Sequence, residues 1–111
     1  MSLRRRNKAE RKASLSAMYP EVKGKVDRAL NSLRAAIDPD LPELHVSRQV
    51  ILGCSVALAR ENFQELAEQV DILSVVMSQY WFSPGFQPDT YLADLDAGAA
   101  WLLSHNYLRR A

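Results

Sequence analysis

Apolar residues recur along this chain with the spacing of an α-helix, and the longest such run lies in the middle of the sequence. Its members are separated alternately by four and three positions: Leu52, Val56, Ala59, Phe63, Leu66, Val70, Leu73, Met77 and Tyr80. We refer to these nine residues as the central apolar stripe. Heptad spacing of this kind is typical of a helix that packs one side against a neighbour. It predicts a long central helix from about Val46 to Tyr80, roughly 50 Å in length at ~1.5 Å rise per residue.

The alternative is a break in this helix near Asn62, because Arg60, Glu61 and Asn62 interrupt the apolar run. The heptad spacing passes through this point without a slip, which favours an unbroken helix or two collinear ones. In the first half, a second apolar face lies beside the stripe and predicts burial on two sides; it consists of Val50, Ile51, Cys54, Ala57 and Leu58. A strand over residues 72–82 is disfavoured, since apolar and polar residues do not alternate cleanly there.

Shorter helical patterns flank the central one. Before it, a helix is expected to begin at Pro20, which suits the first helical position, and to end at the proline-containing segment 38–42. After it, Pro84 and Gly85 predict a turn, and Asp89, with Thr90 as a rival, caps a last helix that folds back antiparallel on the central one. The apolar faces of these two helices are Val22, Val26, Ala29, Leu30, Leu33 and Ile37, and Leu92, Leu95, Ala99 and Leu102. The fold class is therefore all-α, a small helical bundle.

Positive charge is concentrated at the N-terminus. Residues 1–34 hold ten Lys and Arg against three Asp and Glu, a net charge of +7, whereas residues 35–111 hold four against ten, a net charge of −6. We interpret residues 1–14 as a flexible basic arm and residues 15–111 as a single helical domain, because large apolar residues become frequent only from Leu15 onward. Six residues carry the charge of the arm: Arg4, Arg5, Arg6, Lys8, Arg11 and Lys12.

A basic arm of this kind can bind nucleic acid without reading its sequence, since each phosphate that it neutralises releases counterions. No aromatic residue stands between the charges, which argues against stacking on the bases of single strands. Two other interpretations stay open. The arm can be a solvated tail or lie on the acidic surface of its own chain, or it can bind a membrane surface, although it lacks large apolar residues that would insert.

Few residues suit metal binding or catalysis. His45, Cys54 and His105 show no HxxxH or CxxC spacing, so we expect no metal site and no cofactor. Cys54 lies in an almost entirely apolar stretch, which favours a buried side chain over a nucleophile. His105 stands at the end of the last helix, where histidine commonly meets solvent or the helix dipole. Without a phosphate-binding loop, a GxSxG turn or paired carboxylates, we expect no catalytic residue and no enzymatic activity.

Aromatic residues gather around the Pro-Gly turn, where Tyr80, Trp81, Phe82, Phe86 and Tyr91 form either a plug at one end of the bundle or an interface with a partner. A long central helix would leave apolar surface uncovered in a single chain, so we expect a homodimer. The predicted interface comes from the second half of the stripe and from the turn: Phe63, Leu66, Val70, Leu73, Met77, Tyr80, Trp81, Phe82 and Phe86.

These features favour a non-enzymatic helical interaction or regulatory protein, a homodimer whose arm binds nucleic acid. The alternative is a protein-binding adaptor or assembly chaperone that uses the central apolar stripe and the surface around Trp81 and Phe82. The chain of 111 residues has the length of one domain, and its single cysteine fits a reducing compartment. No run approaches the ~18 apolar residues that span a membrane, so the expected location is the cytoplasm.

Overall fold

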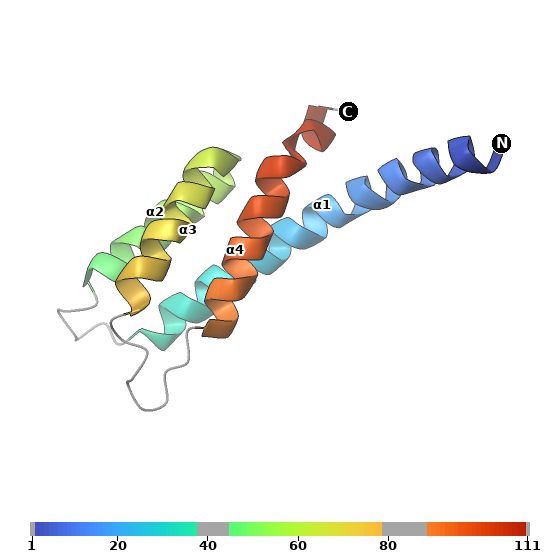
Figure 1. The fold of residues 1–111 in the computed structure, drawn as a ribbon. Coiled ribbons are helices and arrows are strands. Elements are labelled where there is room, and N and C mark those ends of the chain that lie inside the picture. The colour runs from blue at the N-terminus through green and yellow to red at the C-terminus, as the bar shows by residue number, and fades with distance from the viewer. Residues whose placement is uncertain (1, 38–44, 79–88, 111) are drawn as a thin grey trace.

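The computed structural model describes the backbone of residues 2–37, 45–78 and 89–110, and side chains within residues 11–37, 45–78 and 90–108. These residues form four α-helices and a short 3-10 helix: α1 (Ser2–Ala36), α2 (His45–Ala59), α3 (Phe63–Met77), α4 (Asp89–Ser104) and η3 (Asn106–Arg110). Consecutive helices alternate in direction and pack as a bundle (Figure 1). The predicted all-α bundle is confirmed, and no strand occurs in the described parts of the chain.

The prediction of an unbroken or collinear central helix is wrong, and the alternative of a break near Asn62 is the one that the structure adopts. α2 ends at Ala59 and α3 starts at Phe63, and the two helices lie side by side as an antiparallel hairpin (Figure 1). Two local features reverse the chain. Glu61 has a φ of 56°, a left-handed conformation that does not continue a helix. The side chain of Asn62 then caps α3 by accepting a hydrogen bond from the backbone N–H of Glu65 at 3.3 Å.

The hairpin turn is tied to α1 by an ion pair. Lys23 Nζ lies 2.7 Å from Glu61 Oε1, and both side chains are largely covered by their neighbours. A left-handed glutamate costs roughly 1 kcal/mol or more, because its Cβ crowds the following carbonyl oxygen. The contact with Lys23 offsets part of that cost and holds the turn against the first helix.

The hairpin also decides which side of each helix is buried. The α3 half of the central apolar stripe is fully covered: Phe63, Leu66, Val70, Leu73 and Met77 are at most 2% exposed. The α2 half is not, since Leu52 is 60% and Val56 is 41% exposed. The buried side of α2 consists mostly of the second apolar face: Ser47, Ile51, Cys54, Ala57 and Leu58. A helix that folds back must turn toward both α1 and α3, and the face with small residues allows that approach.

The longest helix is α1, not the central one. The prediction of a helix start at Pro20 is wrong, because α1 runs through Pro20 without interruption and residues 2–14 belong to the same helix. Proline in a helix interior removes one hydrogen bond and costs about 3 kcal/mol or more. Pro20 directly follows Tyr19, the first α1 residue packed against the core, so this weak point lies where α1 leaves the bundle.

The core fills the space between the four helices. The predicted inner faces of the flanking helices are confirmed, with Val26, Leu30 and Leu33 of α1 and Leu95 and Leu102 of α4 completely buried. α4 begins at Asp89, the residue that was predicted to cap it, and packs against both α1 and α3. The predicted Pro-Gly turn at residues 83–86 lies outside the described residues.

Candidate anion-binding surfaces

The N-terminal part of α1 projects beyond the bundle. α1 has 35 residues and is about 52 Å long at ~1.5 Å per residue, whereas α4 has 16 residues and is about 24 Å long. The molecule is accordingly elongated, with principal extents of 60, 26 and 19 Å (Figure 1). None of the described side chains from Arg11 to Met18 is buried. We call residues 2–18 the N-terminal extension.

Because the extension is helical, its basic residues fall into a pattern. At about 100° per residue, the positions of Arg4, Lys8 and Arg11 lie one above another on a single side of α1. The positions of Arg5 and Lys12 lie beside them, so all five fall within an arc of about 120°. We call these five residues the basic stripe. The sixth predicted residue, Arg6, falls on the far side of the helix.

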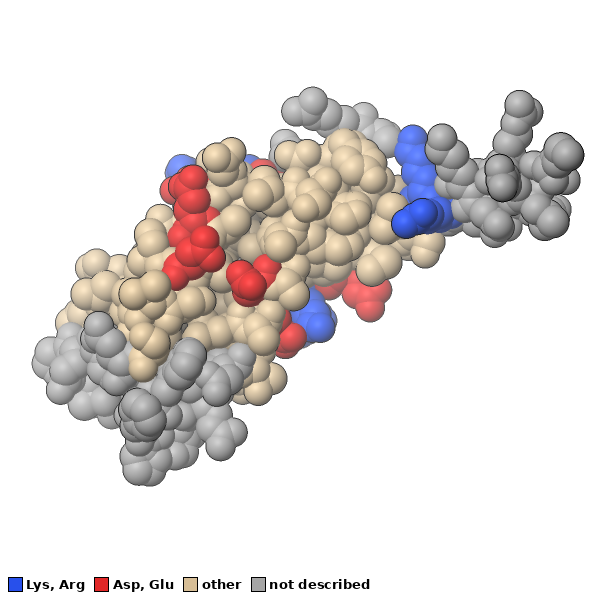
Figure 2. All heavy atoms as spheres, viewed as in Figure 1, with Lys and Arg blue, Asp and Glu red and all other residues tan. Residues whose placement is uncertain are grey.

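The basic stripe continues the side of α1 that packs in the bundle. The positions of Leu15, Tyr19, Val22 and Val26 fall within the same arc, and the last three contact or belong to the core. The stripe is therefore positioned on the side of the extension toward which the rest of the bundle lies. On the visible face in Figure 2, Lys and Arg side chains lie on α1 where it leaves the bundle, without acidic side chains between them, whereas over the bundle itself acidic side chains are accompanied by further basic ones.

Aromatic side chains meet at the corner between the extension and the end of the bundle. Tyr19 packs against Trp101 with ring centroids 6.2 Å apart, and Trp101 stacks on His105 at 4.2 Å with an interplanar angle of 12°. Tyr107 follows at 6.1 Å from His105 and is 52% exposed. η3, which carries Tyr107, contacts α1. We call Tyr19, Trp101, His105 and Tyr107 the aromatic corner.

Sequence reasoning missed the aromatic corner because its members come from both ends of the chain. The interpretation of His105 was partly correct, since its Nδ1 lies 2.9 Å from the backbone oxygen of Trp101 near the end of α4. Its stacking on Trp101 was not foreseen. Spacing gave one usable signal: Trp101 and His105 are four residues apart and so share one side of a helix.

The start of α1 is electrostatically unfavourable as it stands. Its first turn contains no acidic residue and holds Arg4 and Arg5 next to the positive end of the helix dipole. Free backbone N–H groups at a helix start commonly bind anions. An anion placed here would therefore reduce repulsion between like charges in addition to forming new contacts.

The residues of the predicted interface separate into two groups. Five are covered by helices of the same chain, as members of its core: Phe63, Leu66, Val70, Leu73 and Met77. A single chain therefore buries them without a second copy. The other four lie outside the described residues: Tyr80, Trp81, Phe82 and Phe86.

Cys54 is buried, as predicted from its apolar neighbours, and lies in the core between helices. Burial raises the pKa of its thiol from 9.0 to about 12. A thiol of this kind remains protonated at neutral pH and is a poor nucleophile. Within the described part of the chain, no three His, Cys, Asp or Glu side chains form a group that could hold a metal ion.

Neither a protein-family model, nor a curated protein, nor a solved structure matches this chain. None of the helices in the described ranges combines the length and apolar character needed to cross a membrane.

Proposed function

We propose that this protein is a non-enzymatic helical protein that binds nucleic acid through its N-terminal extension, without reading sequence. The observation that carries the proposal is the basic stripe: five positive residues share one side of a helix that projects from the bundle. A straight row of positive charge matches the regular spacing of phosphates along a nucleic acid backbone. Lys and Arg that neutralise phosphates release condensed counterions, which drives binding irrespective of sequence.

The aromatic corner extends this proposal toward single strands. Aromatic rings next to a positively charged track are the combination by which single-stranded nucleic acids are bound, because every base has a face that can stack. Tyr107 is the most accessible of the four rings, and Arg11 and Lys12 lie about two turns along α1 from Tyr19. No aromatic residue stands between the charges in the sequence, but the folded chain brings Trp101 and His105 to the part of α1 from which the extension projects.

The test measures binding of labelled DNA by fluorescence anisotropy across a series of salt concentrations. For duplex DNA, five neutralised phosphates predict that log K falls with log salt with a slope of about −4.5. Lys8→Gln is expected to make the slope less negative by ~0.9, and the triple variant Arg4→Gln/Lys8→Gln/Arg11→Gln by ~2.7.

Arg6→Gln is the matched control, because it removes the same charge from the same helix but from the opposite side. It should change the slope by much less than Lys8→Gln does. Equal effects of Arg6→Gln and Lys8→Gln would show that the charges act as an unstructured tail. Unchanged binding by the triple variant would rule out the extension as the binding surface.

The alternative, a protein-binding adaptor, is favoured by a different observation. Leu52 and Val56 lie one turn apart on the outer side of α2 and are 60% and 41% exposed, although their spacing belongs to the central apolar stripe. Exposed apolar residues in such a row are typical of contacts with a protein, including a second copy of the chain. Light scattering on the wild type and on Leu52→Ser/Val56→Ser would reveal a dimer that depends on this face. Binding to a protein through it should be nearly insensitive to salt, unlike binding to DNA.

A further inference from the structure

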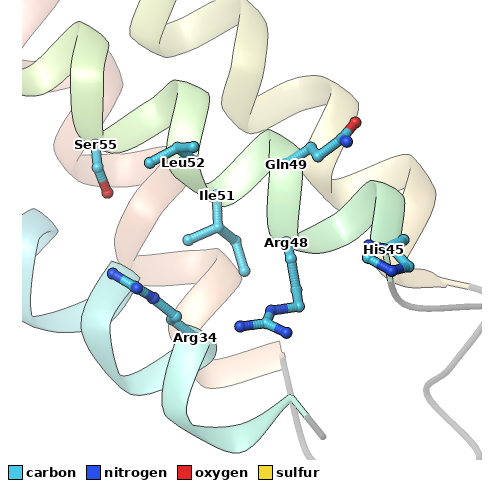
Figure 3. Close-up of a pocket in the computed structure, with 7 residues that line it drawn as sticks. All are labelled: Arg34, His45, Arg48, Gln49, Ile51, Leu52 and Ser55. Atoms are coloured by element: carbon cyan, nitrogen blue, oxygen red, sulfur yellow. The ribbon is translucent and has the colours of Figure 1, made fainter. Parts of the chain in front are cut away.

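A pocket of about 240 Å³ lies at the end of the bundle opposite to the N-terminal extension, between the last turns of α1 and the first turns of α2. It is open to solvent. Residues of both helices line it: Arg34, His45, Arg48, Gln49, Ile51, Leu52 and Ser55. None of them is acidic. Ile51 forms the buried base, and Leu52 adds an apolar wall (Figure 3).

Two arginines from different helices line this pocket. Arg48 extends from α2 toward α1 beside Ile51, whereas the guanidinium group of Arg34 extends from α1 to the side away from Arg48 (Figure 3). The ion pairs found among the described residues, Lys23–Glu61 and Lys25–Asp94, involve neither arginine. The lining of the pocket therefore carries two positively charged side chains and no negatively charged one. A bound anion would compensate this charge.

Further donors surround the two guanidinium groups. His45 opens the first turn of α2, which contains no acidic residue, and Gln49 and Ser55 supply an amide and a hydroxyl. Guanidinium groups bind phosphate through paired, parallel N–H···O bonds, a geometry that a single ammonium group cannot match. The volume is below the ~300 Å³ at which pockets for drug-sized ligands begin, which favours a small ligand.

We propose that this pocket binds the phosphate group of a small phosphomonoester, or inorganic phosphate itself. Arg34 and Arg48 contact the phosphate oxygens, and Ile51 and Leu52 contact the organic part of the ligand. The site is separate from the nucleic-acid surface, because Arg34 lies about 35 Å along α1 from Arg11 at ~1.5 Å per residue. Phosphate binding in this pocket therefore does not depend on nucleic-acid binding by the N-terminal extension.

The test is a titration of the full chain with inorganic phosphate and with phenyl phosphate, followed by isothermal calorimetry at constant ionic strength. Sodium chloride serves as the blank for unspecific anion effects. The expected result is saturable binding of both phosphates, with phenyl phosphate tighter. Arg34→Gln/Arg48→Gln should weaken both at least tenfold, whereas Leu52→Ser should weaken phenyl phosphate alone.

Arg60→Gln is the matched control, because Arg60 directly follows α2, is exposed and does not line the pocket. It should leave phosphate binding unchanged. The linker between α1 and α2 carries Asp38, Asp40 and Glu43, outside the described residues. If these carboxylates satisfied the two arginines, the wild type would give only the chloride response, and the proposal would be wrong. Equal binding by the wild type and the double variant would also overturn it.

DNA binding separates this site from the proposed function. Arg34→Gln/Arg48→Gln should bind duplex DNA with the salt dependence of the wild type, and Arg4→Gln/Lys8→Gln/Arg11→Gln should bind phenyl phosphate as the wild type does. Loss of DNA binding in the pocket variant would mean that the two arginines contact the nucleic acid backbone instead of a small phosphate, which would overturn the independent site.

Discussion

Gly98 of α4 lies directly against Val26 of α1, and a Cβ at position 98 would overlap the Cγ2 atom of Val26. Glycine in a helix interior costs about 1 kcal/mol relative to alanine. That cost is offset here, because the missing side chain lets α4 approach α1 and bury Val26 completely. The contact joins the helices that carry Tyr19 and Trp101, so the packing of these two rings in the aromatic corner depends on it.

Gly98→Ala is expected to lower the free energy of unfolding by about 1–3 kcal/mol, since the added methyl group overpacks a closed core. Gly24→Ala is the matched control. Gly24 is also in a helix, but the nearest atom to an added Cβ is the flexible end of Arg28, at 3.3 Å. That change should stabilise the protein by up to ~1 kcal/mol. Urea unfolding measures both.

The overlap between Gly98 and Val26 can also be tested as a pair. In Gly98→Ala/Val26→Ala, the methyl group at position 98 occupies space that the smaller residue at position 26 releases. The double variant should therefore lose less stability than the sum of the two single variants. Additive losses would show that the two residues do not share this contact.

Asn62→Ala should lower the free energy of unfolding by about 1 kcal/mol, because it removes the side chain that caps α3. Asn31→Ala provides the comparison: Asn31 is exposed on α1, and its amide lies 3.5 Å from Asp27 of the same helix. Alanine there should be neutral or slightly stabilising. If both changes had the same effect, the cap would contribute nothing to the hairpin.

Burial of Cys54 predicts a pH dependence at the alkaline end. The pKa of its thiol is raised from 9.0 to about 12 in the folded state, so between these values the unfolded chain loses a proton that the folded protein keeps. The protonated thiol therefore contributes fully to the free energy of unfolding below pH 9. This contribution is lost as the pH rises toward 12, by at most ~1.4 kcal/mol per pH unit. Cys54→Ala should lose less stability over this range than the wild type, as measured by urea unfolding. Maleimide should label the native wild type at neutral pH much more slowly than the unfolded chain.

The aromatic corner predicts a preference that the basic stripe alone does not. Tyr107→Ala should weaken binding of single-stranded DNA by about 1–3 kcal/mol, the range found when a stacked aromatic residue is removed. Duplex DNA, whose bases are already stacked, should bind as before. Leu103→Ala is a suitable control, because Leu103 is 39% exposed near the end of α4 and has no ring. A loss shared equally by both DNA forms would contradict base stacking at Tyr107.

Much of the helical organisation could be read from single elements. The spacing of Phe63, Leu66 and Val70 defined the buried side of α3, and the inner faces of α1 and α4 followed from the same kind of pattern. Burial of Cys54 was evident from its apolar neighbours. These are properties of one helix at a time, since the side on which apolar residues recur is the side that must leave water.

The tertiary structure decided features that the spacing of apolar residues does not determine. A heptad pattern is the same whether a helix continues past Asn62 or folds back there, because the choice depends on what packs against each half. That choice exposed Leu52 and buried Ile51. Tertiary packing also forms both candidate sites: Tyr19 packs against Trp101 across 82 positions, and Arg34 and Arg48 line one pocket from two different helices. Sequence alone determined that the chain is helical and which sides of α1, α3 and α4 are buried, because those sides are set by the spacing of apolar residues within one helix. Contacts between distant residues determined where the chain turns, which side of α2 is buried and which residues form the surfaces.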